Sequence, residues 1–240
     1  MICEAFAAGC GGSIGDWRRG LKPGPAFFYG VVGETKPIFE KARERGDWFY
    51  CDNSYFDRGR QAYFRVTRNA FQVSKVARGD FKRMESIGVK VKPWRQNGEH
   101  IVVCEQSAAF MELSGFGPNW TNGVVDILST YTQREIRVRS WNRDKGKMSA
   151  TLRADLVNAW ALVTHMSAAA NEALLLGVPV FVTGECAARP MASGVSLEEL
   201  RYIDHPPLHD GRDEWAAYLA TQQWTPDEMR SGKCWRELNG

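Results

Sequence analysis

The stretch from Ala159 to Thr183 constrains the fold of this 240-residue chain more than any other segment. It reads AWALVTHMSAAANEALLLGVPVFVT, and its pattern predicts a strand, a turn, a helix and a second strand. Ser167 is the expected N-cap of a helix over 168–176, whose residues are nearly all strong helix formers. Gly177 is the expected left-handed stop before a buried strand over 178–182. The segment therefore predicts one βαβ unit of an α/β fold.

The start of this helix offers a site for an anion. Ser167 is followed by three alanines, so no bulky side chain covers the first-turn N–H groups and the positive end of the helix dipole. Glu172 lies about one and a half turns further along, where a carboxylate can accept hydrogen bonds from the vicinal hydroxyls of a sugar. The pattern predicts the phosphates of a nucleotide at Ser167 and Ala168 and its ribose at Glu172. The alternative is an ordinary buried βαβ edge that binds no ligand.

These residues also carry a family resemblance. The pattern Ser-x-x-x-x-Glu-Ala-Leu-x-x-Gly-x-Pro-Val resembles the donor-binding motif in the C-terminal half of GT-B glycosyltransferases; its members here are Ser167, Glu172, Ala173, Leu174, Gly177, Pro179 and Val180. The resemblance implies a compact α/β fold with two Rossmann-like halves facing a cleft. It also implies a nucleotide-diphosphate sugar as co-substrate, with UDP-glucose as the expected donor. In that family the serine end of the helix holds the diphosphate and the glutamate holds the ribose.

The length of the chain allows one large domain or two of about 100–120 residues. Gly115-Phe116-Gly117-Pro118 is the expected boundary, because glycine and proline punctuate elements. We therefore expect an acceptor-binding Rossmann-like domain over 1–118 and a nucleotide-sugar-binding domain over 119–222. The last segment, 223–240, is expected to form a helix that packs back on the N-terminal domain, as a C-terminal helix often does in GT-B enzymes.

Further donor-binding residues are expected near the motif. In the resembling family a strand at about residues 134–139 carries basic side chains to the diphosphate, which selects Arg139 and Lys145 by position, with Arg137 beside them. Alternate residues of a strand share a face, so Arg137 and Arg139 would point the same way. His165, just before the helix, is expected to contact the diphosphate or the donor sugar. The alternatives are solvent-facing charges on the strand and a core histidine.

Two carboxylates are candidates for the general base that takes the proton of an acceptor hydroxyl. Asp52 follows a predicted strand over 48–51, and Glu34 follows another over 26–32. Ligands collect beyond the carboxyl ends of strands in open α/β sheets. Asp52 is the first candidate and Glu34 the second, although an Asp-Asn pair also serves as a turn that caps the next loop.

Residues 58–95 carry eleven Lys and Arg against two acids, with aromatic residues interleaved. Cations for phosphates and aromatic faces for bases are typical of nucleic-acid binding. The expected DNA contacts are Tyr55, Arg58, Arg60, Arg65, Arg68, Lys75, Lys82 and Trp94. A solvated basic face over a β core is the alternative, because 63–67 also alternates like a strand, and another polyanion is a third possibility.

The expected function is sugar transfer to a hydroxymethylated base, 5-hydroxymethylcytosine or 5-hydroxymethyluracil, in double-stranded phage DNA. The design resembles that of the phage enzymes that glucosylate such bases, which requires the base to be flipped from the duplex. Two alternatives remain open. One is transfer to a surface polysaccharide or lipopolysaccharide, and the other is a non-catalytic module that binds a nucleotide or a nucleic acid.

Composition excludes several other classes. The six cysteines form no Cys-x-x-Cys pair, so neither a zinc site nor a disulfide framework is indicated. His205 and His209, with Asp204 and Asp210, lack a third ligand at a defined spacing, so no metal site is expected and a divalent metal is not indicated as a cofactor. No apolar run is long enough to span a bilayer. We expect a cytoplasmic protein without membrane insertion, in the host cytoplasm if it is phage-encoded.

Overall fold

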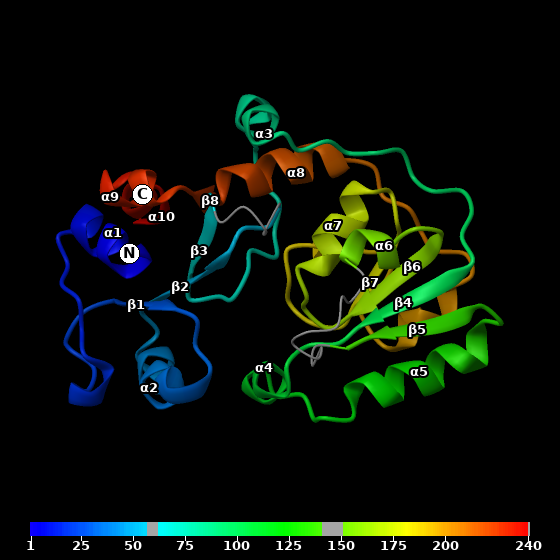
Figure 1. Ribbon diagram of the computed structural model, residues 1–240, viewed down its shortest axis with the longest axis horizontal. Coiled ribbons are helices and arrows are strands. Elements are labelled where there is room, and N and C mark those ends of the chain that lie inside the picture. Colours follow the sequence, from blue (N-terminus) through cyan, green and yellow to red (C-terminus); the bar gives the residue numbers. More distant parts are fainter. Residues whose placement is uncertain (57–61, 141–150, 240) are drawn as a thin grey trace. The chain divides into compact units, whose positions relative to one another are not determined.

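The computed structural model describes residues 1–56, 62–140 and 151–239 and is an α/β protein with two four-stranded sheets (Figure 1). The chain forms two compact units. Unit 1 comprises Met1–Val73 and Leu219–Gly240, and unit 2 comprises Ser74–Tyr218. The boundary expected after residue 118 therefore lies at 73–74 instead. The strand over 100–104, assigned to the first domain from sequence, pairs with strands of the second half of the chain.

Unit 1 is built on a mixed sheet with the order β1-β2-β3-β8. Its strands are β1 (Ala26–Tyr29), β2 (Trp48–Asn53), β3 (Phe64–Arg68) and β8 (Gln223–Trp224). β1 and β2 are parallel, while β3 is antiparallel to both β2 and β8. The helix α2 (Lys36–Arg45) connects β1 to β2 and ends at Gly46, whose φ of 73° is the left-handed conformation that glycine adopts without a Cβ penalty.

The two faces of this sheet are covered by different helices. Phe49 and Cys51 point to one face, where Phe6 of α1 (Ile2–Cys10) and residues of α9 (Pro226–Arg230) and α10 (Lys233–Asn239) complete the core. Trp48 and Tyr50 alternate with them, and Trp48 stacks edge-on against Phe39 of α2 at 5.0 Å. The C-terminal residues therefore complete the core of the N-terminal sheet.

Unit 2 contains a wholly parallel sheet with the order β5-β4-β6-β7. The strands are β4 (His100–Cys104), β5 (Glu135–Arg139), β6 (Ala159–Thr164) and β7 (Val180–Val182). When the strands are numbered in chain order from β4 to β7, their order across the sheet is 2-1-3-4, which is the order of one class of doubly wound sheet. The order reverses between β4 and β6, and this switch point is where such sheets open a crevice for ligands.

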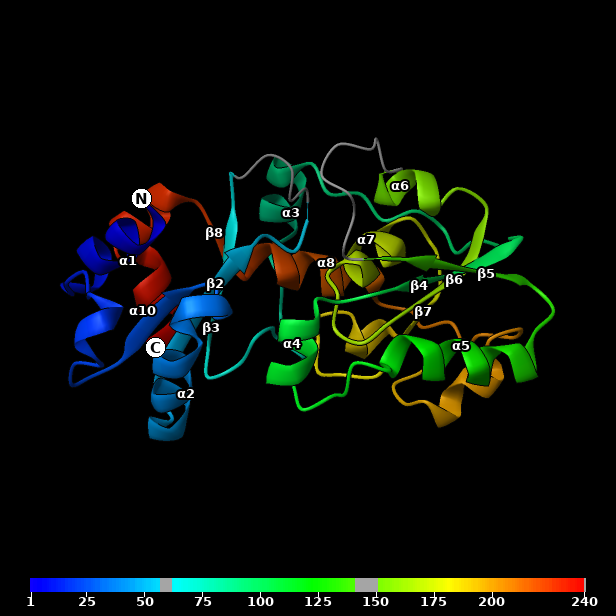
Figure 2. The same cartoon turned by 60° about the horizontal axis from the view of Figure 1, so that its bottom comes forward.

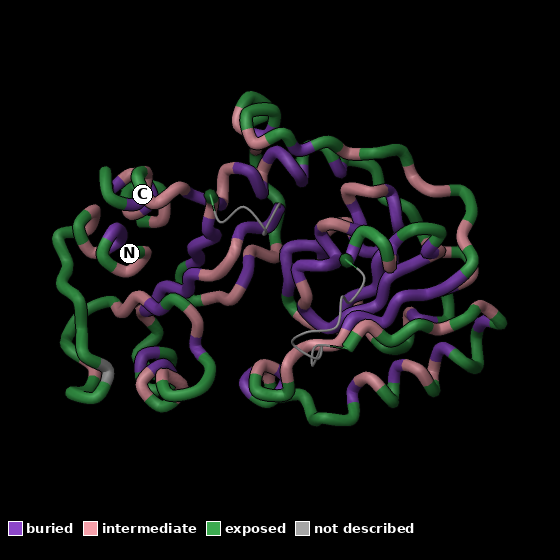
Figure 3. Tube along the Cα trace, viewed as in Figure 1, coloured by how far each residue is buried: buried purple, intermediate pink, exposed green. Residues whose placement is uncertain are grey.

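Helices cover both faces of the parallel sheet (Figure 2). The helix α5 (Trp120–Tyr131) lies on one face, where Val124 and Leu128 pack against Ile101 and Val103 of β4. The helix α7 (Ala169–Leu175) connects β6 to β7 on the other face. Because both faces are covered, every residue of β4 is buried, as Figure 3 shows along the strand.

The remaining helices of unit 2 are α3 (Phe81–Ile87), α4 (Ala108–Leu113) and α6 (Leu152–Asp155), and α8 (Arg212–Thr221) continues from unit 2 into unit 1. In the described part of the chain, no helix has the length and apolar character needed to cross a membrane.

The end of α7 is fixed by a close backbone contact. Gly177 has a φ of 77°, and a Cβ placed on it would lie 2.0 Å from the carbonyl oxygen of Pro93. The segment that contains Pro93 is held there because Lys92 donates its N–H to the carbonyl of Leu175 and Arg95 donates to that of Gly177.

We predict that Gly177→Ala lowers the free energy of unfolding by about 3 kcal/mol or more. The strain of a side chain at positive φ and the overlap of the new Cβ with the carbonyl of Pro93 both contribute to this loss. Gly88→Ala is the matched control: Gly88 has the same φ of 77°, but its Cβ would meet nothing within 4 Å. That variant should lose only about 1 kcal/mol. Urea denaturation of both variants measures the difference, and equal losses would contradict the role of the Pro93 contact.

Candidate functional site

The loops that follow β4 and β6 meet at the switch point of unit 2. Gln106, two residues after β4, accepts a hydrogen bond from the backbone N–H of Met166 at 2.8 Å. Thr164, the last residue of β6, donates its hydroxyl to the carbonyl of Cys104 at 2.9 Å. These contacts fix the two loops against each other at the edge where ligands bind in doubly wound sheets. Gln106 was not among the residues selected from sequence, and no local motif marks it.

A small pocket opens at this edge. Its volume is about 120 Å³, and its lining residues are Glu105, Gln106, Ala108, Met111, Pro118, Trp120 and Thr121. These residues come from the end of β4, from α4 and from the start of α5, all within unit 2. A cavity of about 150 Å³ holds a benzene ring in another protein, so this pocket has room for about one ring.

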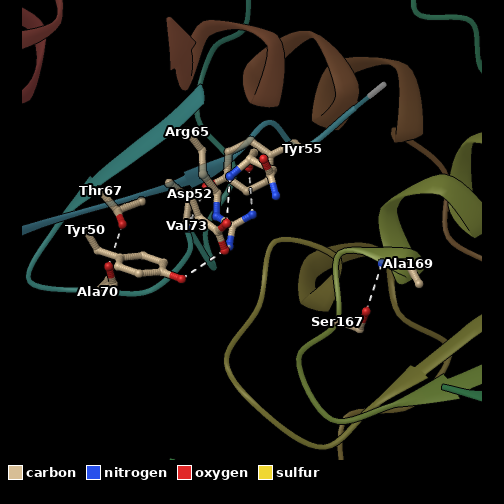
Figure 4. Close-up of polar contacts among 10 residues, drawn as sticks. Tyr50, Asp52, Tyr55, Arg65, Thr67, Ala70, Val73, Ser167 and Ala169 are labelled. Atoms are coloured by element: carbon tan, nitrogen blue, oxygen red, sulfur yellow. Dashed lines mark hydrogen bonds and ion pairs between the residues drawn. The ribbon is translucent and has the colours of Figure 1, made fainter. Parts of the chain in front are cut away.

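The predicted anion site at the start of α7 is partly occupied by the protein itself. The hydroxyl of Ser167 accepts the N–H of Ala169 at 3.2 Å (Figure 4), but the N-cap of α7 is Ala168 and not Ser167 as the sequence suggested. Gln106 takes the N–H of Met166, and the N–H groups of Ala170 and Asn171 bond to the carbonyls of Ser167 and Ala168, so four N–H groups around the helix start have internal partners. Ser167 and Glu172 are half-buried, and Ala168 is 6 % exposed. No bulky side chain follows Ser167, but fewer donors are free there than the sequence suggested.

His165 is a buried, neutral histidine. Its ring Nδ1 lies 2.9 Å from the hydroxyl oxygen of Thr183, which also accepts the indole N–H of Trp120 at 2.9 Å. The ring of Phe116 packs on it with centroids 4.0 Å apart. Burial lowers the pKa of His165 to about 4, because the charged form is poorly solvated there. At neutral pH His165 therefore carries no positive charge.

The arginines expected to grip the diphosphate are engaged in ion pairs within unit 2. Arg139, only 14 % exposed, pairs with Asp155 of α6, and Arg137 pairs with Glu135 at 2.5 Å. This half-buried ion pair of Arg139 would have to open before the guanidinium met a phosphate. Lys145 lies outside the described residues.

Asp52, the first candidate base, lies at the end of β2 in unit 1 and is strongly hydrogen-bonded (Figure 4). One carboxylate oxygen accepts from Arg65 at 2.6 Å and from the hydroxyl of Tyr50 at 2.9 Å. The other oxygen accepts the backbone N–H of Asn53 at 2.7 Å. Burial and then the charge of Asp52 raise the pKa of Tyr50, so Tyr50 stays protonated and donates. Three internal donors therefore already bond to the two oxygens of this carboxylate.

Arg65 is the buried partner of this carboxylate and not the exposed phosphate contact that the sequence suggested. It is 5 % exposed, donates to the carbonyl of Asn53 at 2.9 Å and lies near the ring of Tyr55. Tyr55 is fully buried, and its hydroxyl accepts the N–H of Val73. The expectation that Arg65 and Tyr55 are exposed DNA contacts is therefore wrong. The register of β2 and β3 pairs Arg65 with Asp52, and Tyr55 is buried in the core.

The other expected DNA contacts differ in their surroundings. Trp94 is half-buried, with the guanidinium of Arg212 stacked 3.6 Å from its ring centroid, so that ring face is covered. Arg68 is 41 % exposed and pairs with Asp47 at 3.0 Å. Lys75 and Lys82 are exposed in unit 2. Arg58 and Arg60 lie outside the described residues.

Glu34, the second candidate base, is exposed in a short 3₁₀ helix over Gly33–Thr35, after β1 in unit 1. A scan of the sequence against protein-family models finds no match, and a search of curated proteins finds none. Function is therefore inferred from the motif and from the geometry of the residues.

We predict that Asp52→Ala lowers the free energy of unfolding by about 3 kcal/mol, because it leaves the buried Arg65 charge without its partner. The double variant Asp52→Ala/Arg65→Met should recover much of this loss, since it removes both charges. Asp47→Ala, which breaks the exposed pair with Arg68, should cost less than about 1 kcal/mol. Denaturation curves of the three variants measure these free energies of unfolding. An unchanged free energy of unfolding in Asp52→Ala would show that the ion pair is not needed for stability.

A second prediction concerns pH. The pKa of His165 is about 4 in the folded protein and about 6.5 when unfolded, so its contribution to stability is complete above pH 6.5 and is lost as the pH falls toward 4. The loss amounts to about 3 kcal/mol. His165→Gln should flatten the stability curve over this range, whereas the exposed His205→Gln should leave it unchanged. Parallel curves for wild type and His165→Gln, measured by denaturation at several pH values, would count against a buried neutral imidazole.

Proposed function

We propose that the chain is a glycosyltransferase that binds a nucleotide-diphosphate sugar in unit 2 and transfers the sugar to a hydroxymethylated base in DNA. The observation that carries the proposal is the position of the motif. Ser167 lies three residues after the end of β6, at the switch point of a parallel doubly wound sheet, where such folds bind nucleotides. The resemblance of residues 167–180 to the GT-B donor motif supports a nucleotide that carries a sugar.

The donor would lie along the carboxyl edge of the sheet. Its phosphates would meet the start of α7 near Ser167 and Ala168, and the carboxylate of Glu172 would bind hydroxyls of the ribose. His165, neutral and fixed by Thr183, would contribute a hydrogen bond and no charge. In transfer, the bond between the anomeric carbon and the diphosphate oxygen breaks, and dipoles near Ser167 stabilise the leaving diphosphate.

The acceptor hydroxymethyl group needs a base. We propose Glu34 for this role in preference to Asp52, because the oxygens of Asp52 accept three internal hydrogen bonds whereas Glu34 is exposed. Its carboxylate would take the proton of the acceptor hydroxyl. Support for DNA as the acceptor comes from the exposed cations of 75–92, among them Lys75 and Lys82.

A second candidate function is a non-catalytic nucleotide-binding module. The specific observation in its favour is that charged groups expected to do chemistry are held in ion pairs, Asp52 with Arg65 and Arg139 with Asp155. A binding module requires the site in unit 2 but neither a base nor an acceptor. It differs from the transferase in one measurable way, because it leaves a nucleotide sugar intact.

Incubation with radiolabelled UDP-glucose and hydroxymethylated duplex DNA tests the proposal. Label is expected in the hydroxymethylated duplex and not in an unmodified duplex of the same sequence. Glu34→Gln should reduce transfer at least about 100-fold while nucleotide and DNA affinities stay unchanged, as loss of a general base does. Glu40→Gln, another exposed carboxylate of unit 1, is the control. UDP binding without transfer to either duplex would favour the binding module, and absence of UDP binding would refute both.

A further inference from the structure

The basic segment of unit 2, residues 75–92, presents one aromatic side chain to the solvent. Phe81, the first residue of α3, is 46 % exposed. The other aromatic residues that the structure describes between positions 55 and 95 are buried or half-buried; they are Tyr55, Phe56, Tyr63, Phe64, Phe71 and Trp94. Among these residues, Phe81 is therefore the one whose ring a large ligand can reach from solvent.

The backbone at Phe81 is held in a fixed place although the ring is exposed. Asp80 caps α3, because its carboxylate accepts two N–H groups of the first turn at 2.9 and 3.2 Å. Gly79, just before the cap, touches α8, and a Cβ placed on it would lie 2.2 Å from the backbone nitrogen of Tyr218. The N–H of Asp80 donates to the carbonyl of Ala217 at 3.3 Å. The start of α3 is thus fixed beside α8 (Figure 1), so the ring is presented without the cost of ordering a loop.

The segment around Phe81 is positively charged. Residues 75–92 contain six Lys and Arg against two acids. Of the two acids, Asp80 is engaged by the first turn of α3, and Glu85 is exposed on the same helix. The exposed cations are Lys75, Arg78, Lys82, Lys90 and Lys92. This segment therefore attracts a polyanion, and Glu85 is the charge that opposes it.

An exposed phenyl ring among cations fits one class of partner better than others. The cations attract the phosphates of a nucleic acid, and the face of the ring can stack on a base of any sequence. A membrane surface also attracts cations, but a helix that binds there needs a broad apolar face. The seven-residue α3 lacks such a face, because its Met84 is buried. A DNA strand with unpaired bases satisfies both the charges and the ring.

We propose that Phe81 stacks on an unpaired base of DNA while Lys82 and the neighbouring cations contact phosphates of the same strand. The inference rests on the proposed function and deepens it, because a base that receives a sugar must leave the duplex and expose unpaired DNA. The sequence suggested Trp94 as a stacking residue, but Arg212 covers its ring. Phe81 is the base-stacking residue instead, and its contact is independent of the DNA sequence.

Fluorescence anisotropy with two labelled strands of about 12 nucleotides tests the inference: oligothymidine, and a strand of abasic sites with the same number of phosphates. Phe81→Ala should weaken oligothymidine binding about 10- to 100-fold, because stacking is lost, and should leave binding of the abasic strand unchanged. Phe81→Trp keeps an aromatic face and should bind both strands like the wild type. Lys82→Gln should weaken both strands alike and make the slope of log K against log salt shallower by about 0.7, the loss of one phosphate contact.

Three further variants are matched to these. Tyr131→Ala removes a ring of almost the same exposure, 47 %, from α5 and should change neither affinity. Phe81→Leu keeps apolar bulk without an aromatic face and should lose oligothymidine affinity as Phe81→Ala does. Glu85→Gln removes the opposing charge and should strengthen the binding of both strands.

The possible failures of the inference and of the proposed function can be told apart. Equal affinity of the wild type and Phe81→Ala for oligothymidine, or an equal loss for both strands, would overturn the stacking contact while wild-type DNA binding still supported the proposed function. A loss in Phe81→Ala that is confined to phosphatidylserine vesicles would overturn it in favour of a membrane contact. A wild type that binds neither strand would overturn both the contact and DNA as the acceptor. Stacking as expected, without sugar transfer to hydroxymethylated DNA, would overturn the proposed function alone.

Discussion

The central position of β4, hydrogen-bonded to β5 on one side and to β6 on the other, is the constraint on which unit 2 depends. A parallel strand paired on both edges and covered on both faces is expected to be mostly apolar, and β4 is buried along its whole length, with His100 as its polar residue. This position brings the loop after β4 against the loop after β6. The Gln106–Met166 hydrogen bond and the pocket at Glu105 both follow from that meeting. The candidate site is therefore a consequence of strand order.

Unit 1 depends on a different interaction, the ion pair between Asp52 and Arg65. A buried guanidinium is costly unless it is paired and hydrogen-bonded, and here it also donates to the carbonyl of Asn53 and lies near the rings of Tyr50 and Tyr55. The most conspicuous basic and acidic residues of this region thus stabilise each other. An active-site role for a carboxylate requires an oxygen that is free to accept a proton, which is why the exposed Glu34 suits the proposed chemistry better.

Local patterns predicted the elements well and their partners poorly. Helix formers placed α7 to within one residue at each end, and apolar runs placed β1 and β2 to within a few residues. The helix α1 escaped notice because it is short and its N-cap residue, Met1, provides no side-chain hydrogen bond. The burial of Arg65 could not be predicted, because it depends on the register that sets Asp52 opposite Arg65. Trp94 looked like a stacking platform, but Arg212, remote in sequence, occupies its face. In each case the deciding contact joins distant parts of the chain.

Unit 1 is formed by two separate segments of the chain, and this affects when it can fold during translation. Unit 2 is continuous, so it can fold as soon as residue 218 has emerged. Unit 1 must wait, because Trp224, Met229 and Cys234 belong to the same core as Phe6 and Phe49. Until those residues are synthesised, only α1 covers this apolar face of the sheet, and incompletely covered apolar surfaces aggregate or recruit chaperones. The order of folding is thus the reverse of the order of translation.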